Sequence, residues 1–224
     1  MLSLITPVFS IAQLSDHTRL VDRNIAVYSG DSMPFSFSSQ LSTIVGFAEK
    51  LHPRSVLDVG TGMGQYGFLL RNNLESVNLF EIQGDQGRQR DRSQWQIRID
   101  GIEGFREYLT PVHHYAYTNL LIGNALDLLP NIPTASYELV LAIDILEHFT
   151  IEDAASFINE CKRVCSGAFL ISTPKEFIEQ DIPANPLENH RSFWSEDDLK
   201  RYGFTQFLPD PMSWIGVYRG SPLP

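Results

Sequence analysis

The stretch Ser55-Val56-Leu57-Asp58-Val59-Gly60-Thr61-Gly62-Met63-Gly64 decides the fold of this 224-residue chain. Its apolar residues predict a short buried strand, in which Asp58 is an acid where a purely structural strand is usually apolar. Three alternating glycines follow, and then a helix-forming run to about Asn73. Strand, glycine turn and helix open a nucleotide-binding βαβ unit, because glycine lets the backbone approach a ligand where a Cβ atom would collide.

Composition limits the classes of protein that this chain can be. With 43% hydrophobic and 20% charged residues, 224 residues predict one sizeable domain. The net charge of −10 argues against a general nucleic-acid binder, because phosphate contacts depend on clustered Lys and Arg. Cys161 and Cys165 form no C-x-x-C motif, so we expect two reduced core thiols rather than a zinc site or a disulfide framework.

The first residues differ in character from the rest. Residues 1–34 have no strong hydrophobic period, and we interpret them as an N-terminal arm ahead of a main domain at 35–224. The sequence leaves the role of this arm open: it could cover a site, join a homodimer or pack on the domain edge. No basic residue precedes Arg19 and no apolar run approaches ~18 residues, so we predict a soluble, cytoplasmic protein without a membrane span.

Strands and helices are predicted to alternate along the main domain. A helical stripe begins after Ser38 or Ser39 and ends at Pro53. Further strands are predicted at 96–103, 120–125, 137–144 and 167–173, and the runs beginning at Thr150 and Ser195 fit capping boxes of helices. Residues 204–208 and 213–218 fit an antiparallel hairpin. This order predicts a mainly parallel, three-layer α/β sheet.

Three segments between the predicted elements are ambiguous. Residues 77–82 also fit a strand, and the polar Gly84-to-Trp95 segment is interpreted as a solvated loop or as a flap near a ligand. His113 and His114 are neighbours that cannot both face one site, so we expect surface or packing roles. The connection at 175–194 is long, and such connections are more often functional than idle.

Three motifs together resemble the class I S-adenosylmethionine-dependent methyltransferases, over about residues 38–220. They are Leu57 to Gly64, Gly123-Asn124-Ala125, and Ala142-Ile143-Asp144-Ile145-Leu146-Glu147-His148, which resembles the D-x-L-E-H turn of small-molecule methyltransferases. The run His190 to Ser195 resembles a subgroup of uncharacterised bacterial members. The resemblance implies a Rossmann-like three-layer sandwich whose seven-stranded, mainly parallel sheet ends in an antiparallel C-terminal hairpin.

The resemblance also implies a site for S-adenosylmethionine, with S-adenosylhomocysteine as the product. The glycine turn would contact the amino-acid part of the cofactor, and an acid that ends the second strand would accept hydrogen bonds from both ribose hydroxyls. Polar and small residues after the third strand would lie at the adenine edge, and an acid after the fourth would lie beside the methyl group. The residues that match these positions are Asp58, Gly60, Thr61, Gly62, Gly64, Glu103, Asn124, Ala125 and Asp144.

The acid of the second strand has two candidates, Glu81 and Glu103. We assign Glu103, because Asp100-Gly101-Ile102-Glu103 matches the strand-two ending of the family, whereas Glu81 runs into a polar loop. This assignment makes the interval from the glycine turn to the acid unusually long. Residues 76–96 are then an insertion.

Methyl transfer from a sulfonium is an in-line displacement, to which a protein mostly contributes proximity and orientation. A base is needed only if the acceptor must lose a proton, and His148 and His190 are the candidates, with packing and surface roles as alternatives. The sequence shows no metal-ligand cluster, so metal assistance is not expected. We predict a small-molecule acceptor. The sequence does not determine whether it is a sugar, a lipid intermediate or a carboxylate, and a protein acceptor also stays open.

Other functions fit parts of the sequence. Gly62 to Gly67 matches G-x-G-x-x-G and Glu81 follows about 20 residues later, as in an NAD(P)-dependent oxidoreductase, although Asp58 would repel a pyrophosphate. A non-catalytic cofactor-binding protein on the same fold is a second alternative. A nucleic-acid methyltransferase is disfavoured, because Asp144-Ile145-Leu146-Glu147 stands where an Asn-Pro-Pro-Tyr-like turn would be expected.

Overall fold

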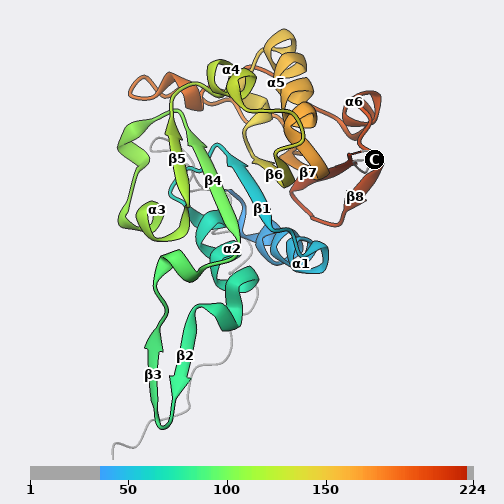
Figure 1. The fold of residues 1–224 in the computed structure, drawn as a ribbon. Coiled ribbons are helices and arrows are strands. Elements are labelled where there is room, and N and C mark those ends of the chain that lie inside the picture. Colours follow the sequence, from blue (N-terminus) through green and yellow to red (C-terminus); the bar gives the residue numbers. More distant parts are fainter. Residues whose placement is uncertain (1–35, 221–224) are drawn as a thin grey trace, which may run out of the picture. The chain divides into compact units, whose positions relative to one another are not determined.

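Seven strands form one sheet in the order β5-β4-β1-β6-β7-β9-β8 (Figure 1). The structure, a computed structural model, describes residues 36–220, so the predicted arm at 1–34 lies outside the described residues. Neighbouring strands are parallel except for β9, which runs antiparallel to both β7 and β8. The predicted fold class is therefore confirmed. The strands are β1 (Ser55–Val59), β4 (Arg98–Glu103), β5 (Asn119–Ile122), β6 (Tyr137–Ile143), β7 (Cys165–Pro174), β8 (Gln206–Leu208) and β9 (Ser213–Arg219).

Helices cover both faces of this sheet. One core cluster joins the sheet to α1 (Leu41–Leu51), α2 (Gln65–Glu75) and α3 (Pro111–Ala116). A second cluster joins it to α4 (Ala125–Leu128), α5 (Ile151–Val164) and α6 (Glu196–Arg201). Because the central strands are buried on both faces, their sequences are almost continuously apolar, as in β6.

Local capping signals place several helix ends where the sequence predicts them. Thr150 is the N-cap of α5, and its side chain accepts a hydrogen bond from the Asp153 amide. Ser195 opens α6 with a complete capping box, in which the Asp198 side chain bonds back to the Ser195 amide. Helix α1 ends at His52, whose left-handed backbone directly precedes Pro53. Each cap satisfies helix-end groups that have no partner within the helix.

The segment between α2 and β4 differs from its prediction. We expected a loop or flap from Gly84 to Trp95, but β2 (Phe80–Gln83) and β3 (Gln86–Gln89) form an antiparallel hairpin outside the main sheet. Gly84 has a φ of 65°, which suits the tight turn between them. The two strands satisfy each other's backbone groups while most of their side chains stay exposed, and the ribbon extends away from the main sheet (Figure 1).

A buried arginine closes the base of this insertion. Arg71 is fully buried in α2 and donates hydrogen bonds to Glu75 and to the carbonyl oxygens of Ala116 and Ile97. The Glu75 carboxylate also accepts the Ile97 amide, at 2.6 Å. The chain therefore leaves the domain and returns to it at neighbouring points, so the insertion does not disturb β4.

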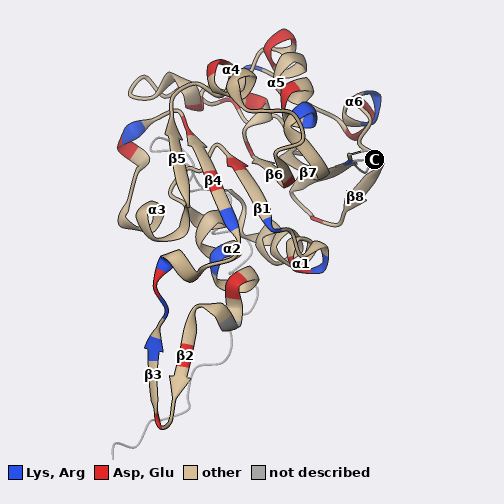
Figure 2. Cartoon of the chain, viewed as in Figure 1, with Lys and Arg blue, Asp and Glu red and all other residues tan. Residues whose placement is uncertain are grey.

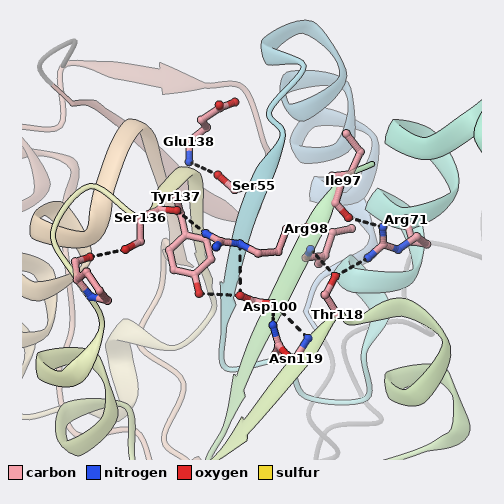
Figure 3. Close-up of polar contacts among 12 residues, drawn as sticks. Ser55, Arg71, Ile97, Arg98, Asp100, Thr118, Asn119, Ser136, Tyr137 and Glu138 are labelled. Carbon is pink, nitrogen blue, oxygen red and sulfur yellow. Dashed lines mark hydrogen bonds and ion pairs between the residues drawn. The ribbon is translucent and has the colours of Figure 1, made fainter. Parts of the chain in front are cut away.

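A polar cluster ties the strands together near the start of β4 (Figure 3). Asp100 is buried and accepts hydrogen bonds from the Tyr137 hydroxyl at 2.8 Å and from the backbone and side-chain nitrogens of Asn119. Arg98 lies 3.5 Å from the same carboxylate. Because β4, β5 and β6 each contribute a residue, this cluster fixes the register of the sheet away from the glycine turn.

Two further expectations concern the whole chain. Cys161 and Cys165 are both free and buried, as predicted. Within residues 36–220, every helix is too short or too polar to cross a membrane.

Two helix glycines provide a matched test of the packing. A Cβ atom at Gly67 would lie 2.2 Å from the Tyr117 ring, whereas one at Gly46 would have no atom within 4 Å. We expect Gly46→Ala to raise the free energy of unfolding by up to about 1 kcal/mol, which is the difference in helix propensity. Gly67→Ala has the same propensity gain but overpacks the core, so we expect a net loss of about 1–3 kcal/mol. Urea unfolding measures both, and equal effects would contradict the packing around Tyr117.

Candidate functional site

Three acids meet where the central strands end. Asp58 lies in β1, Glu103 is the last residue of β4, and Asp144 directly follows β6. These strands are neighbours and parallel, so their carboxyl ends share one edge, and Figure 2 shows acidic residues toward the ends of β1 and β4. The chain order reverses between β1 and β6, and open α/β sheets bind ligands at such a point.

The backbone conformation of the turn requires glycine at three positions. Gly60, Gly62 and Gly64 have φ values of 78°, 52° and 84°, a region that residues with a side chain rarely adopt. A Cβ atom at Gly60 would also lie 2.7 Å from the Ile145 side chain. The Gly60 amide donates to the Ile102 carbonyl oxygen at 2.9 Å, so the turn bends across the end of β4.

The Glu103 carboxylate holds the turn in place. Its Oε2 accepts the Gly62 amide at 2.8 Å and the Thr61 hydroxyl at 3.1 Å, and its Oε1 accepts the Phe105 amide at 2.8 Å. Burial raises the pKa of Glu103, and these hydrogen bonds oppose that rise. Glu81 lies instead in the β2–β3 hairpin, where it pairs with Arg88.

Burial of Asp58 disfavours the charged form of its carboxyl group. The Tyr117 hydroxyl donates to its Oδ2 at 2.6 Å, and only 2% of the residue is exposed. Burial raises the pKa of Asp58 to about 7, against the Tyr117 hydrogen bond and with a contribution from Glu103. A positive group beside Asp58 would relieve this cost.

His113 lies next to the glycine turn, although it is not among the site residues predicted from the sequence. The Thr110 amide donates to His113 Nδ1 at 3.0 Å, so the ring proton is on Nε2, which donates to the Thr61 hydroxyl at 3.1 Å. Thr61 in turn donates to Glu103. His113 is buried while its neighbour His114 is exposed, so the expected packing and surface roles are divided between them. Thr110-Pro111, an N-cap followed by proline, is the sequence signal for the helix that orients His113.

Asp144 is held by residues from two other segments. Its backbone has a φ of 49°, and its carboxylate accepts the Ser172 hydroxyl at 2.7 Å and the Gln40 amide nitrogen at 2.5 Å. Burial raises the pKa of Asp144. The buried Gln40 Oε1 and Tyr66 hydroxyl have no hydrogen-bond partner among the described residues. Both the burial of Tyr66 and the charges of Asp144 and Asp58 raise the pKa of Tyr66, so this hydroxyl lies near both acids.

Asn124 and Ala125 lie at the start of α4, beside the end of β5. The Asn124 Oδ1 accepts the Leu126 amide at 2.9 Å and so caps the helix. The oxygen is thereby committed, whereas the amide nitrogen of this exposed side chain remains accessible. Ala125 is buried directly after it.

The two predicted catalytic histidines come together. His148 ends the 3-10 turn η6 (Leu146–His148), and its ring centroid lies 5.0 Å from that of His190. Burial lowers the pKa of His148 to about 4, with a smaller contribution from His190, and burial also lowers the pKa of His190. Both imidazoles are therefore neutral at pH 7. Glu147, to which the sequence gave no role, is buried beside them.

Backbone hydrogen bonds place the 175–194 connection on this turn. The Arg191 and Ser192 amides donate to the Glu147 carbonyl oxygen at 2.7 and 3.1 Å. Trp194 is buried and donates to the Ser192 hydroxyl at 2.8 Å. The buried indole thus anchors the segment that brings His190 to His148.

No protein-family model matches the chain, and no curated protein matches its sequence. Solved structures do match its fold. An O-methyltransferase family protein from Burkholderia thailandensis aligns with a TM-score of 0.57 and 15% identity over 82% of this chain; the alignment spans 57% of that protein's length. A SAM-dependent methyltransferase from Archaeoglobus fulgidus aligns with a TM-score of 0.53 and 13% identity, over 80% of this chain and 93% of its own.

This is the fold of the S-adenosylmethionine-dependent methyltransferases. A third match is magnesium protoporphyrin IX methyltransferase from Synechocystis PCC 6803 with bound SAH, with a TM-score of 0.51, 14% identity and coverage of 80% and 81% of the two chains. Identities this low concern the methyltransferase fold alone. The chemistry of the site must come from the residues of this chain.

The pKa of Asp58 predicts a pH-dependent stability. Because this pKa is raised from 3.8 to about 7, the folded protein keeps a proton that the unfolded chain has lost between those values, and stability falls as pH rises through this range. Asp58→Asn keeps an acceptor for Tyr117 but removes the charge. We expect its free energy of unfolding, relative to wild type, to rise by roughly 1.4 kcal/mol per pH unit between about pH 5.5 and 7. Urea unfolding at several pH values measures this, and parallel curves would contradict it.

Proposed function

We propose that this protein transfers a methyl group from S-adenosylmethionine to a small-molecule acceptor and releases S-adenosylhomocysteine. One observation carries the proposal: buried acids surround the glycine turn at the point where the sheet order reverses. S-adenosylmethionine carries a sulfonium and an ammonium group, and either would compensate the cost of burying Asp58 and Asp144. The fold shared with known methyltransferases supports the same cofactor.

The free acceptors of the site suit the amino-acid end of this cofactor. Gln40 Oε1 and the Tyr66 hydroxyl are buried, and the described part of the chain offers neither a hydrogen-bond partner. An ammonium group has three donors, so it would bind between such acceptors and Asp58. Gly60, Thr61, Gly62 and Gly64 would contact this end through the backbone, without a side chain in the way.

Each remaining site residue has a role in this proposal. Glu103 would accept a ribose hydroxyl at its remaining lone-pair site, because a carboxylate has about four such sites and three are used here. Asn124 would donate its amide to the adenine edge beside the small Ala125. Asp144 would lie next to the methyl group, held by Ser172 and Gln40.

The proposed reaction needs few catalytic groups from the protein. The acceptor atom attacks the methyl carbon in line as the carbon–sulfur bond breaks, and the fold supplies orientation and exclusion of water. His148 and His190 are neutral at pH 7 and are the candidate bases for an acceptor that must lose a proton. His190 suits this role better, because a pKa of about 4 makes His148 a weak base. The net charge of −10 supports an acceptor other than nucleic acid.

The oxidoreductase alternative is weaker on this geometry. In its fingerprint the acid follows the glycines by about 20 residues and ends the strand next to β1. Glu81 has that spacing but lies in the separate β2–β3 hairpin, whereas Glu103 ends the strand next to β1 but follows Gly62 by about 40 residues. The pyrophosphate of a dinucleotide would also face Asp58 and Glu103, which carry like charge. A non-catalytic cofactor-binding protein would share the site but would transfer no methyl group.

Ligand-induced stabilisation tests the cofactor. We expect S-adenosylhomocysteine at 100 times its Kd to stabilise the protein by about 2.7 kcal/mol, seen as a rise in Tm, and NAD to have little effect. Glu103→Ala should weaken S-adenosylhomocysteine binding by at least about tenfold, because a hydrogen bond to a charged group contributes about 1.5–3 kcal/mol. Glu81→Ala is the matched control and should bind like wild type.

Calorimetric titration of both variants completes the test. No stabilisation by S-adenosylhomocysteine would refute the proposed cofactor, and equal stabilisation by NAD would favour the oxidoreductase. A loss of binding in Glu81→Ala instead of Glu103→Ala would overturn the assignment of the ribose acid. Transfer of a labelled methyl group to an acceptor separates an enzyme from a cofactor-binding protein.

A further inference from the structure

Glu147, His148 and His190 form a cluster whose chemistry the proposed methyl transfer does not require. One candidate ligand atom from each lies within 4.8 Å of the other two. We propose that these three side chains bind a divalent first-row transition-metal ion, such as Mn²⁺, Fe²⁺, Co²⁺ or Zn²⁺. Adjacent residues of η6 supply two ligands, and the 175–194 connection supplies the third.

Two of the three side chains have buried atoms that lack a partner. Neither Glu147 Oε2 nor His148 Nδ1 has a hydrogen-bond partner within the described residues. Only 4% of Glu147 is exposed, so water does not replace the missing partner across an open surface. Buried polar atoms without a partner are rare, because each costs free energy, and a metal ion would satisfy both of these.

The third ligand is already oriented. His190 Nδ1 lies 2.5 Å from the Ile178 carbonyl oxygen, to which it must donate, so the lone pair is on Nε2. A metal-binding histidine commonly donates its other ring nitrogen to a backbone carbonyl in this way, which fixes the tautomer and the ring orientation. The amides that anchor Arg191 and Ser192 to the Glu147 carbonyl oxygen hold the third ligand close to the other two.

The surrounding charges favour a cation. Glu147 carries the carboxylate of the cluster, and the charges of Asp144 and Glu188 act on it in addition to its burial. Asp144 also acts on His190. The ordinary alternative for such a cluster is a hydrogen bond between Glu147 and one of the imidazoles. A hydrogen bond between Glu147 Oε2 and His148 Nδ1 would give both atoms a partner, and the described residues show no such bond.

The donor set selects the kind of metal. Two imidazole nitrogens and one carboxylate oxygen suit first-row transition metals, whereas Mg²⁺ and Ca²⁺ prefer oxygen ligands. Metal bonds of about 2.0–2.2 Å at tetrahedral angles place ligand atoms roughly 3.4 Å apart, so side-chain rotations that bring the three atoms closer than 4.8 Å would complete the site. Three protein ligands leave open positions on the ion, as in catalytic sites.

The open positions give the ion a role that rests on the proposed function. The cluster lies at the end of β6 beside Asp144, where that proposal has the methyl group. An acceptor hydroxyl bound to the ion would have a lowered pKa and would lose its proton to solvent. Its oxygen would then form a bond to the methyl carbon as the carbon–sulfur bond breaks, which leaves neutral S-adenosylhomocysteine. His148 and His190 would serve as metal ligands instead of bases, and the acceptor atom would be oxygen.

Metal binding without cofactor tests the site directly. Untagged full-length protein is treated with a chelator, dialysed and titrated with Mn²⁺ by electron paramagnetic resonance and with Zn²⁺ by calorimetry. We expect one ion per chain. Glu147→Gln and His190→Gln should each weaken binding by at least about tenfold, since even the loss of an outer-shell partner costs about 10–100-fold. His114→Gln, which alters an exposed histidine on α3, is the control and should bind like wild type.

The outcomes separate this site from the proposed cofactor. Failure of wild type to bind either ion, or unchanged binding in both variants, would overturn the metal site. If Glu147→Gln does not fold, His190→Gln carries the test, because its side chain is only half-buried. S-adenosylhomocysteine binding is measured separately on the same chelated protein. Its absence alongside metal binding would refute the methyl-transfer proposal alone, and the reverse result would refute the metal site alone.

Discussion

The hydrogen bonds between the Glu103 carboxylate and the glycine turn are the interaction on which the site depends. They join the ends of β4 and β1, and the same carboxylate accepts the Phe105 amide on its other oxygen. A relay from the Thr110 amide through His113 to Thr61 ends on the same carboxylate oxygen that accepts the Gly62 amide. The turn is thus held by side chains of the protein itself, and such preorganisation lowers the entropic cost of binding a ligand.

Burial of acids is the second constraint on this edge of the sheet. Asp58, Asp144 and Glu147 lie where charge is poorly solvated, and burial raises the pKa of each. Such groups cost stability unless a positive partner compensates them. The fold retains them at or just beyond the carboxyl ends of β1 and β6, the edge at which open α/β sheets bind ligands. This pattern of acids favours cationic ligands over a pyrophosphate.

Local signals explain most of what the sequence predicted. Features that depend on residues close in sequence can be predicted from the sequence. They include the apolar strands, the Thr150 and Ser195 caps and the helix end at Pro53. The strand candidate at 77–82 overlaps β2, but β3 and its pairing with β2 were missed. The side chains of both strands are mostly exposed, which leaves no periodic apolar face in the sequence. The site residue Gln40 was missed for another reason: it reaches Asp144 from a segment far away in the chain.

The sequence by itself determined the sheet, the glycine turn and the set of acids at the strand ends, because periodicity and glycine geometry act between neighbouring residues. Tertiary structure decided which polar side chains meet. Nothing local links His190 to His148, or His113 to Thr61, because these contacts depend on a buried Trp194 and on the strand order. The sequence specifies the chemistry of each side chain, but the packing of the sheet and its connections determines which remote groups lie close together.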